Sequence, residues 1–173
     1  MRIFIASSNE LNHERVYLAN VVFYLGRLLH DMGHRHRVEL IKWEYLDSSM
    51  GIDNKQSEYN RVLEACDAVI ALFWRKFGEY TENEFLTALQ GSTESGHPRK
   101  LMVLFKETDD TVSPQLAAYR ESLPRKFGIK PQAFSSDSEL RDSFLSLVFD
   151  ILRANCFDFA VPDDDMLTRY CLR

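Results

Sequence analysis

Several features that mark common protein classes are scarce in this sequence. Only seven of its 173 residues are glycine, and neither G-x-G-x-x-G nor G-x-x-x-x-G-K-S/T occurs. Those glycine-rich loops bind phosphates in dinucleotide dehydrogenases and in P-loop NTPases. Their absence disfavours a classical dehydrogenase, a kinase and a GTPase.

Cysteine and positive charge are also limited. Cys66, Cys156 and Cys171 are odd in number and have no C-x-x-C spacing, which favours reduced thiols in a cytoplasmic protein over a disulfide framework. The net charge is −5, and the one dense basic run, 34–37, is short. Because such a run cannot follow a phosphate backbone, we expect no direct binding to nucleic acid.

No segment predicts a membrane span or a metal site. The most apolar helical stretch, 16–29, is interrupted by an arginine and is too short to cross a bilayer. Residues 1–8 have the pattern of a strand rather than of a leader. His30, His34 and His36 lack a carboxylate or cysteine at a matching spacing, so a solvated helix end is favoured over a set of metal ligands.

What the sequence does contain is a regular alternation of strand and helix patterns. The run 67–74 is almost entirely apolar, as in a parallel strand that is covered on both faces. The expected strands are 2–8, 38–43, 67–74, 100–106 and 129–134, and the expected helices are 13–32, 56–66, one starting at 81, 114–122 and 137–152. This order predicts an α/β fold: a flavodoxin-like, doubly wound, five-stranded parallel sheet of order 2-1-3-4-5 with helices on both faces.

One domain is expected over residues 1–154, since the chain length suits a single domain with a full core. Residues 155–173 lie outside the predicted fold. Their Pro162-Asp163-Asp164-Asp165 run is typical of a solvated linker. We therefore expect a tail that leads toward a C-terminal domain absent from this sequence.

The predicted topology brings three distant segments to one crevice. In an open α/β sheet, ligands bind at the carboxyl ends of the strands where the strand order reverses, here between the first and third strands. Ser7 and Ser8 end the first strand, a polar loop over 44–54 follows the second, and Glu84 opens the helix after the third. Glu84 is therefore the leading candidate for catalysis.

Two interpretations of Glu84 are open at this point. Thr81-x-x-Glu84 has the form of a capping box, in which Glu84 binds the backbone at the start of its helix. Alternatively the carboxylate faces the crevice, where the positive end of the helix keeps it ionised and able to stabilise positive charge. Trp43 and Trp74, which end strands two and three, either close the core or offer a ligand a stacking surface.

A set of short motifs resembles a bacterial TIR domain of the kind found in anti-phage defence and NAD-consuming signalling proteins. The resemblance covers about residues 1–152. The motifs are Ile3-Phe4-Ile5-Ala6-Ser7-Ser8-Asn9-Glu10-Leu11, Glu14-Arg15, Trp43-Glu44-Tyr45-Leu46, Gln56-Ser57-Glu58-Tyr59-Asn60, Cys66-Asp67 and Gly78-Glu79-Tyr80-Thr81-x-x-Glu84.

The resemblance implies a flavodoxin-like NAD+ glycohydrolase or cyclase that cleaves the nicotinamide–ribose bond and uses NAD+ as a substrate, with no other cofactor. It implies Glu84 as the catalytic residue, with an aromatic residue four positions earlier, where this chain has Tyr80 and the family more often has tryptophan. The NAD+ site would be lined by Ser7, Ser8, Trp43, Glu44, Asp47, Trp74 and Tyr80.

The same resemblance implies activation by self-association through TIR–TIR contacts, as the effector of a bacterial antiviral defence or signalling system with a C-terminal sensor domain or partner. Two alternatives are a non-catalytic TIR interaction module and a nucleoside deoxyribosyltransferase-like enzyme. In the last, Glu84 and Ala88 would form an E-x-x-x-A motif and the glutamate would be a covalent nucleophile.

Overall fold

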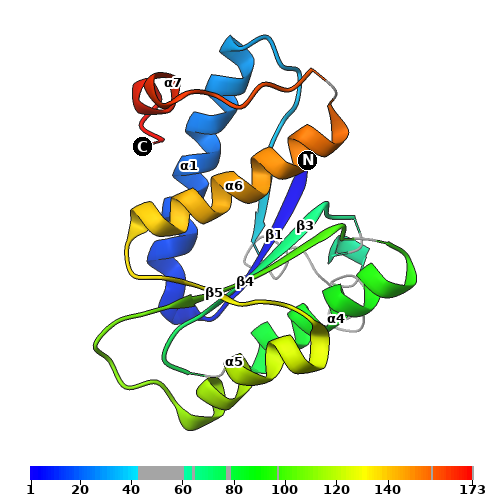
Figure 1. The fold of residues 1–173 in the computed structure, drawn as a ribbon, viewed down its shortest axis with the longest axis vertical. Helices are drawn as coiled ribbons and strands as arrows, with labels where there is room; N and C mark the ends of the chain where they lie inside the picture. The colour runs from blue at the N-terminus through cyan, green and yellow to red at the C-terminus, as the bar shows by residue number, and fades with distance from the viewer. Residues whose placement is uncertain (43–60, 64, 77–78, 97, 157, 173) are drawn as a thin grey trace, which may run out of the picture.

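A computed structural model describes residues 1–42, 61–63, 65–76, 79–96, 98–156 and 158–172, without the side chains of Glu79 and Tyr80. Five strands form one sheet: β1 (Arg2–Ser7), β2 (Glu39–Lys42), β3 (Ala68–Phe73), β4 (Lys100–Lys106) and β5 (Gln132–Phe134). All neighbouring strands are parallel and their order is β2-β1-β3-β4-β5. The predicted fold class and strand order are therefore confirmed (Figure 1).

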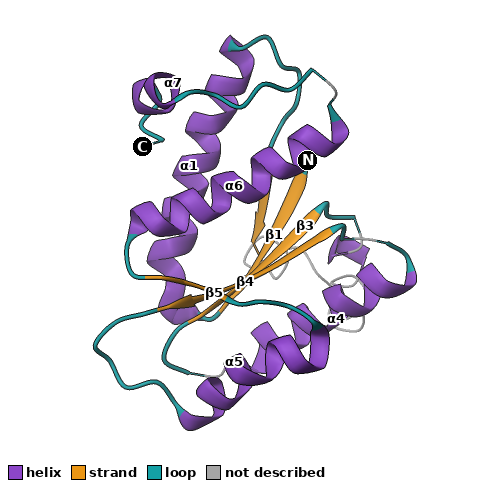
Figure 2. Cartoon of the chain, viewed as in Figure 1, coloured by secondary structure: helices purple, strands orange, loops and turns teal. Residues whose placement is uncertain are grey.

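Helices cover both faces of this sheet (Figure 2). The helical elements are η1 (Asn9–Leu11), α1 (Asn12–Asp31), α4 (Glu79–Glu94), α5 (Pro114–Phe127), α6 (Asp137–Asn155) and α7 (Asp164–Arg169). Helices α1 and α6 pack on one face, and α4 and α5 pack on the other. The sheet is thus the middle of three layers, and this explains why its central strands β1, β3 and β4 are largely apolar.

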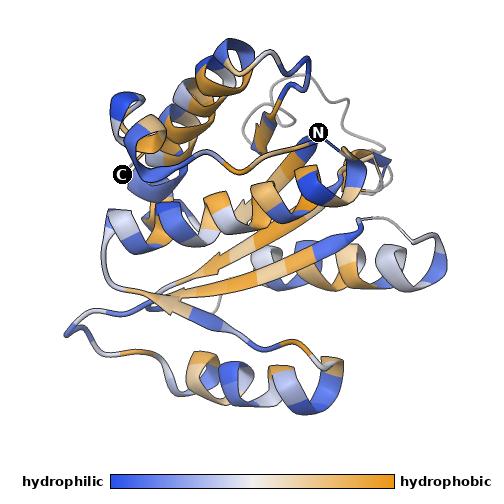
Figure 3. Cartoon of the chain, turned by 45° about the horizontal axis from the view of Figure 1, so that its top comes forward, coloured by the Kyte–Doolittle hydropathy of each residue, from blue (hydrophilic) through white to orange (hydrophobic). Residues whose placement is uncertain are grey.

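Alternation along each strand divides the core in two. Ile3 and Ile5 of β1 point toward α1 and α6, whereas Phe4 and Ala6 point toward α4 and α5. The same alternation in β3 and β4 gives each face its own apolar cluster. Figure 3 shows the largely apolar strands between helices that carry both hydrophobic and hydrophilic residues.

The C-terminal tail differs from the prediction, because it packs on the domain. Phe159 and Leu172 are buried in the cluster beneath α1 and α6. The Tyr170 hydroxyl donates a hydrogen bond to Asp31 at the end of α1, and α7 lies beside α1 (Figure 1). Asp163, which was assigned to a linker, is the N-cap of α7. The expectation that a further domain follows stays a prediction.

Several boundaries also differ. Helix α4 begins at Glu79, two residues before the expected start, and continues to Glu94. Helix α5 extends past Pro124 to Phe127, and Gly128 follows it with a φ of 66°, in the left-handed region that glycine adopts most readily. The predicted helix over 56–66 lies largely outside the described residues. Within the described residues, no helix is long and apolar enough to cross a membrane.

Candidate active site at the carboxyl edge of the sheet

The strands β1, β3 and β4 end at nearly the same level. Ser7 of β1 pairs with Leu72 of β3, and Phe73 pairs with Phe105 of β4. Because the strands are parallel, the residues that follow them share one edge of the sheet. The ends of β1 and β3 therefore share this edge, and α4 packs against both strands.

Glu84 lies on the flank of α4 that is turned away from α5. Helix α4 packs on the sheet through Thr81, Phe85 and Ala88, which are buried. Burial and then the nearby carboxylate of Glu82 raise the pKa of Tyr119 on α5, so Glu82 lies on the α5 side.

Residues two apart on a helix lie about 200° apart around its axis. Glu84, two residues after Glu82, consequently faces the opposite side, where α4 packs against β1. Its side chain is partly buried there. This is the side on which the sequence placed the crevice between the first and third strands.

The capping interpretation of Glu84 does not fit the position of Thr81. An N-cap residue stands outside the helix with extended backbone angles. Thr81 is the third residue of α4, and its side chain is 2% exposed. The helix therefore starts before the predicted Thr81 cap, and Glu84 lies in its second turn.

Ser7 and Ser8 are held by a buried arginine that the sequence motifs included without a role. One terminal nitrogen of Arg15, Nη1, donates to Ser7 Oγ at 2.8 Å and to the Ser8 carbonyl at 2.7 Å. The other, Nη2, donates to Asn12 Oδ1 at 3.4 Å. Arg15 is 2% exposed and Ser7 is 5% exposed. The turn from β1 into α1 is thereby fixed by charge-assisted hydrogen bonds.

A second buried charge lies beside this turn. Glu14 in the first turn of α1 is 1% exposed, and its Oε1 accepts a hydrogen bond from Lys106 Nζ at 2.6 Å. Lys106 is the last residue of β4, so the ion pair connects α1 to β4 beyond the end of β3. Neither Glu14 nor Lys106 was assigned a role from the sequence. The available signal was that Glu14 lies midway between Leu11 and Leu18 on the apolar stripe of α1.

Trp74 follows β3 and packs against the α1 and α6 cluster. Its Nε1 donates to Thr108 Oγ1 at 3.0 Å. The guanidinium of Arg75 lies 3.7 Å from the ring centre, and Lys106 Nζ lies 4.2 Å from it. The indole thus contacts two cations, and its predicted contact with NAD+ stays a prediction.

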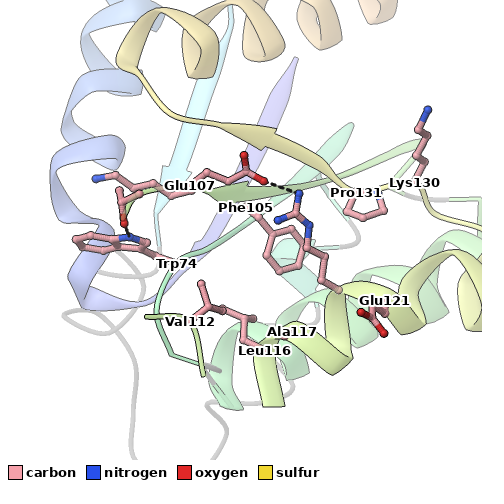
Figure 4. A pocket seen from close by; sticks show the side chains of 12 residues that line it. Trp74, Phe105, Glu107, Val112, Leu116, Ala117, Glu121, Lys130 and Pro131 are labelled. Atoms are coloured by element: carbon pink, nitrogen blue, oxygen red, sulfur yellow. Dashed lines mark hydrogen bonds and ion pairs between the residues drawn. The ribbon is translucent and has the colours of Figure 1, made fainter. Parts of the chain in front are cut away.

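A groove of about 790 Å³ lies between the end of β4 and helix α5. Figure 4 shows Trp74 on one side of it, and Leu116, Ala117 and Glu121 of α5 on the other. Of the predicted site residues whose side chains are described, only Trp74 lines this groove. Glu84 faces away from α5, so the groove and the Glu84 flank are separate regions of the edge.

Three predicted binding residues, Trp43, Glu44 and Asp47, lie outside the described residues. Tyr80 lies in the first turn of α4, four residues before Glu84 as expected, but its side chain is not described. Across the described parts of the chain, no three His, Cys, Asp or Glu side chains are grouped so as to hold a metal ion.

Comparison with known proteins finds similarity among solved structures but none among family models or curated proteins. No protein-family model matches the chain, and no curated protein matches it. Among solved structures, the chain is similar to the CMP N-glycosidase BcmB of Clostridium botulinum, with a TM-score of 0.53 and 16% sequence identity. The match covers 84% of this chain and 99% of that one. At this identity the similarity shows a shared fold.

Proposed function

We propose that this protein cleaves an N-glycosidic bond of a nucleotide and that Glu84 is its catalytic carboxylate. The observation that carries the proposal is the position of Glu84 on the flank of α4 beside β1, at the edge where ligands bind in open α/β sheets. Two further observations support it: the resemblance of the sequence motifs to NAD-consuming TIR domains, and a fold shared with a CMP N-glycosidase over nearly all of that protein.

NAD+ is the substrate that we propose first, because the sequence motifs favour it. Nicotinamide is cationic in NAD+ and leaves as a neutral molecule, so the leaving group needs no proton donor. The ribose develops the positive charge of an oxocarbenium ion. An ionised Glu84 stabilises that charge, and water or the adenine of the same molecule then bonds to the ribose carbon. The products are nicotinamide and ADP-ribose or a cyclic isomer.

A pyrimidine nucleotide is the second candidate, favoured by the structural relative that acts on CMP. Loss of cytosine requires more assistance, because the base leaves as an anion unless it is protonated. A carboxylate that attacks the ribose carbon would form a covalent intermediate and split the reaction into two steps. Ala88, buried one turn after Glu84, completes the E-x-x-x-A motif expected of the deoxyribosyltransferase-like alternative.

The biological setting that we propose is a bacterial defence or signalling system in which self-association activates the enzyme. The opposing hypothesis is a TIR-like module that binds partners without catalysis. Because activity that depends on assembly is lost on dilution, the assay should use concentrated or artificially clustered protein.

The experiment incubates such protein with NAD+ and with CMP and identifies the products by mass. Free nicotinamide would identify the NAD+ activity, and free cytosine would identify the pyrimidine nucleotide activity. Release of neither base by clustered protein would contradict the proposed function and favour the interaction module.

A further inference from the structure

The carboxylate of Glu14 has a hydrogen-bonding capacity that its ion pair does not use. Oε1 accepts from Lys106 Nζ at 2.6 Å. Oε2 is fully buried and has no hydrogen-bond partner among the described residues. A buried carboxylate oxygen that loses water without gaining a donor costs free energy, so such atoms are rare in folded proteins.

A structural role for the ion pair does not account for the second oxygen. The link between α1 and β4 is made through Oε1 alone, and Lys106 Nζ also lies over the Trp74 ring at 4.2 Å. An apolar pair of similar size could make the same link without burying a charge. The unused oxygen is therefore better explained by a donor that joins the site.

Ser7 has the complementary capacity on the same face of the sheet. Its side chain points toward α1, as those of Ile3 and Ile5 do. Ser7 Oγ accepts a hydrogen bond from Arg15 Nη1 at 2.8 Å. Arginine has donors only, so that bond leaves the serine hydroxyl hydrogen unused, and no described residue accepts it. The end of β1 thus has a buried donor and, in the first turn of α1, a buried acceptor.

We propose that Glu14 and Ser7 bind the ribose of the nucleotide substrate, with Glu14 Oε2 accepting from a ribose hydroxyl and Ser7 donating to a ribose oxygen. This inference rests on the proposed function. A ribose offers neighbouring hydroxyls, each of which donates and accepts. A phosphate only accepts hydrogen bonds and would be repelled by Glu14. The pair therefore selects ribonucleotides over their deoxy analogues.

The test measures binding by calorimetry in the Glu84→Gln background, so that chemistry is not required. The probes are NAD+ and CMP together with their 2′-deoxy and 3′-deoxy analogues. We expect one deoxy analogue of the bound nucleotide to bind at least about tenfold more weakly than the ribose form. Adding Glu14→Gln, which replaces the free acceptor with an amide donor, should bring that ratio close to one.

Two further variants separate binding from folding. Glu39→Gln is the matched control, because Glu39 is also ion-paired, with Arg2 at 3.4 Å, but lies at the amino edge of the sheet. It should leave the ratio unchanged. The double variant Glu14→Gln/Lys106→Met removes both charges, so it can replace Glu14→Gln if the single variant does not fold.

The possible results distinguish this inference from the proposed function. A ratio that Glu14→Gln leaves unchanged, or equal binding of ribose and deoxy forms by the parent, overturns the inference and means that Oε2 holds a buried water only. A Glu14-dependent preference in a protein that releases no base supports the ribose site and overturns the glycosidase. Failure to bind any probe overturns both.

Discussion

At the carboxyl edge of the sheet, the charged residues on the α1 side are more buried than Glu84 on the α4 side. On the α1 side, Glu14 and Arg15 are almost fully buried, and their bonds to Lys106, Ser7 and the Ser8 backbone fix them in place. On the α4 side, Glu84 is only partly buried. The difference suggests a division of roles, in which the α1 side positions the ligand and the α4 side supplies the reactive carboxylate.

The largest effect on stability is expected on the α1 side. Lys106→Met removes the partner of Glu14 and leaves a buried carboxylate unpaired, so the free energy of unfolding should fall by about 3–5 kcal/mol. Urea unfolding at neutral pH measures this loss. On the α4 side, Glu84→Gln should change the free energy of unfolding by less than about 1 kcal/mol, because the side chain is partly exposed.

The control for this comparison is the double variant Glu14→Gln/Lys106→Met, which should regain most of the lost stability because neither charge of the pair remains. A double-mutant cycle isolates the coupling between the two residues. If Lys106→Met lowered the free energy of unfolding by less than about 1 kcal/mol, the ion pair on the α1 side would contribute no more to stability than an exposed one.

Arg15→Lys should have a smaller effect, of about 1–3 kcal/mol on unfolding, because a lysine ammonium lacks the planar fork that reaches Ser7, Ser8 and Asn12 together. If Ser7 contacts substrate, KM should rise more than kcat falls. Steady-state kinetics with whichever nucleotide is cleaved would check this. If the variant is less stable but its KM is unchanged, Arg15 contributes to folding and not to substrate binding.

Two cysteines should differ in reactivity. Cys66 lies just before β3 at the amino edge of the sheet, where burial raises the pKa of its thiol to about 11, whereas Cys171 in the C-terminal tail is exposed. Alkylation of native protein near pH 8, followed by mass spectrometry, should modify Cys171 and leave Cys66 intact. Because the folded protein holds the Cys66 proton more tightly than the unfolded chain, stability should decline as the pH rises from about 9 to 11. Rapid alkylation of Cys66 would contradict its burial.

The smallest effect is expected at the exposed start of α6. Ser136 Oγ accepts from the Glu139 amide at 3.3 Å, and Glu139 accepts from the Ser135 amide at 2.6 Å. Ser136→Ala should cost about 1 kcal/mol in thermal or urea unfolding. The Ser135 amide and hydroxyl lower the pKa of Glu139, so its contribution should be lost as the pH falls through that lowered value. If Ser136→Ala lowered the free energy of unfolding as much as Lys106→Met does, the expected order of effects would be wrong.

The sequence predicted the sheet well because its signals are local. The run 100–106 matches β4 residue for residue, and 67–74 encloses β3. Strand order then followed from the alternation of strands and helices. The tail was missed because Phe159 and Leu172 are isolated apolar residues with no periodicity, and their burial depends on surfaces of α1 and α6 that form only in the folded chain.

The candidate site could be derived from the sequence only in part. Glu84 was selected because it follows an apolar strand and lies near the start of a helix, which are local features, and its catalytic role stays a prediction. Glu14 pairs with Lys106, a residue 92 positions away in the sequence. The pairing depends on the register of β4 in the sheet and on which side of α1 packs against the sheet. No local sequence pattern specifies the register or the orientation. Sequence did offer one hint, a carboxylate at a position where helical periodicity requires an apolar residue.

The central claim is tested most directly by two carboxylates on the same helix. Glu84 and Glu82 lie on opposite flanks of α4, and Glu82 lies on the α5 side near Tyr119. With NAD+ and CMP as substrates, Glu84→Gln should lower the rate of base release by about a hundredfold or more, and Glu82→Gln should leave it within about threefold. Base release by Glu84→Gln at the rate of the parent protein would contradict the assignment.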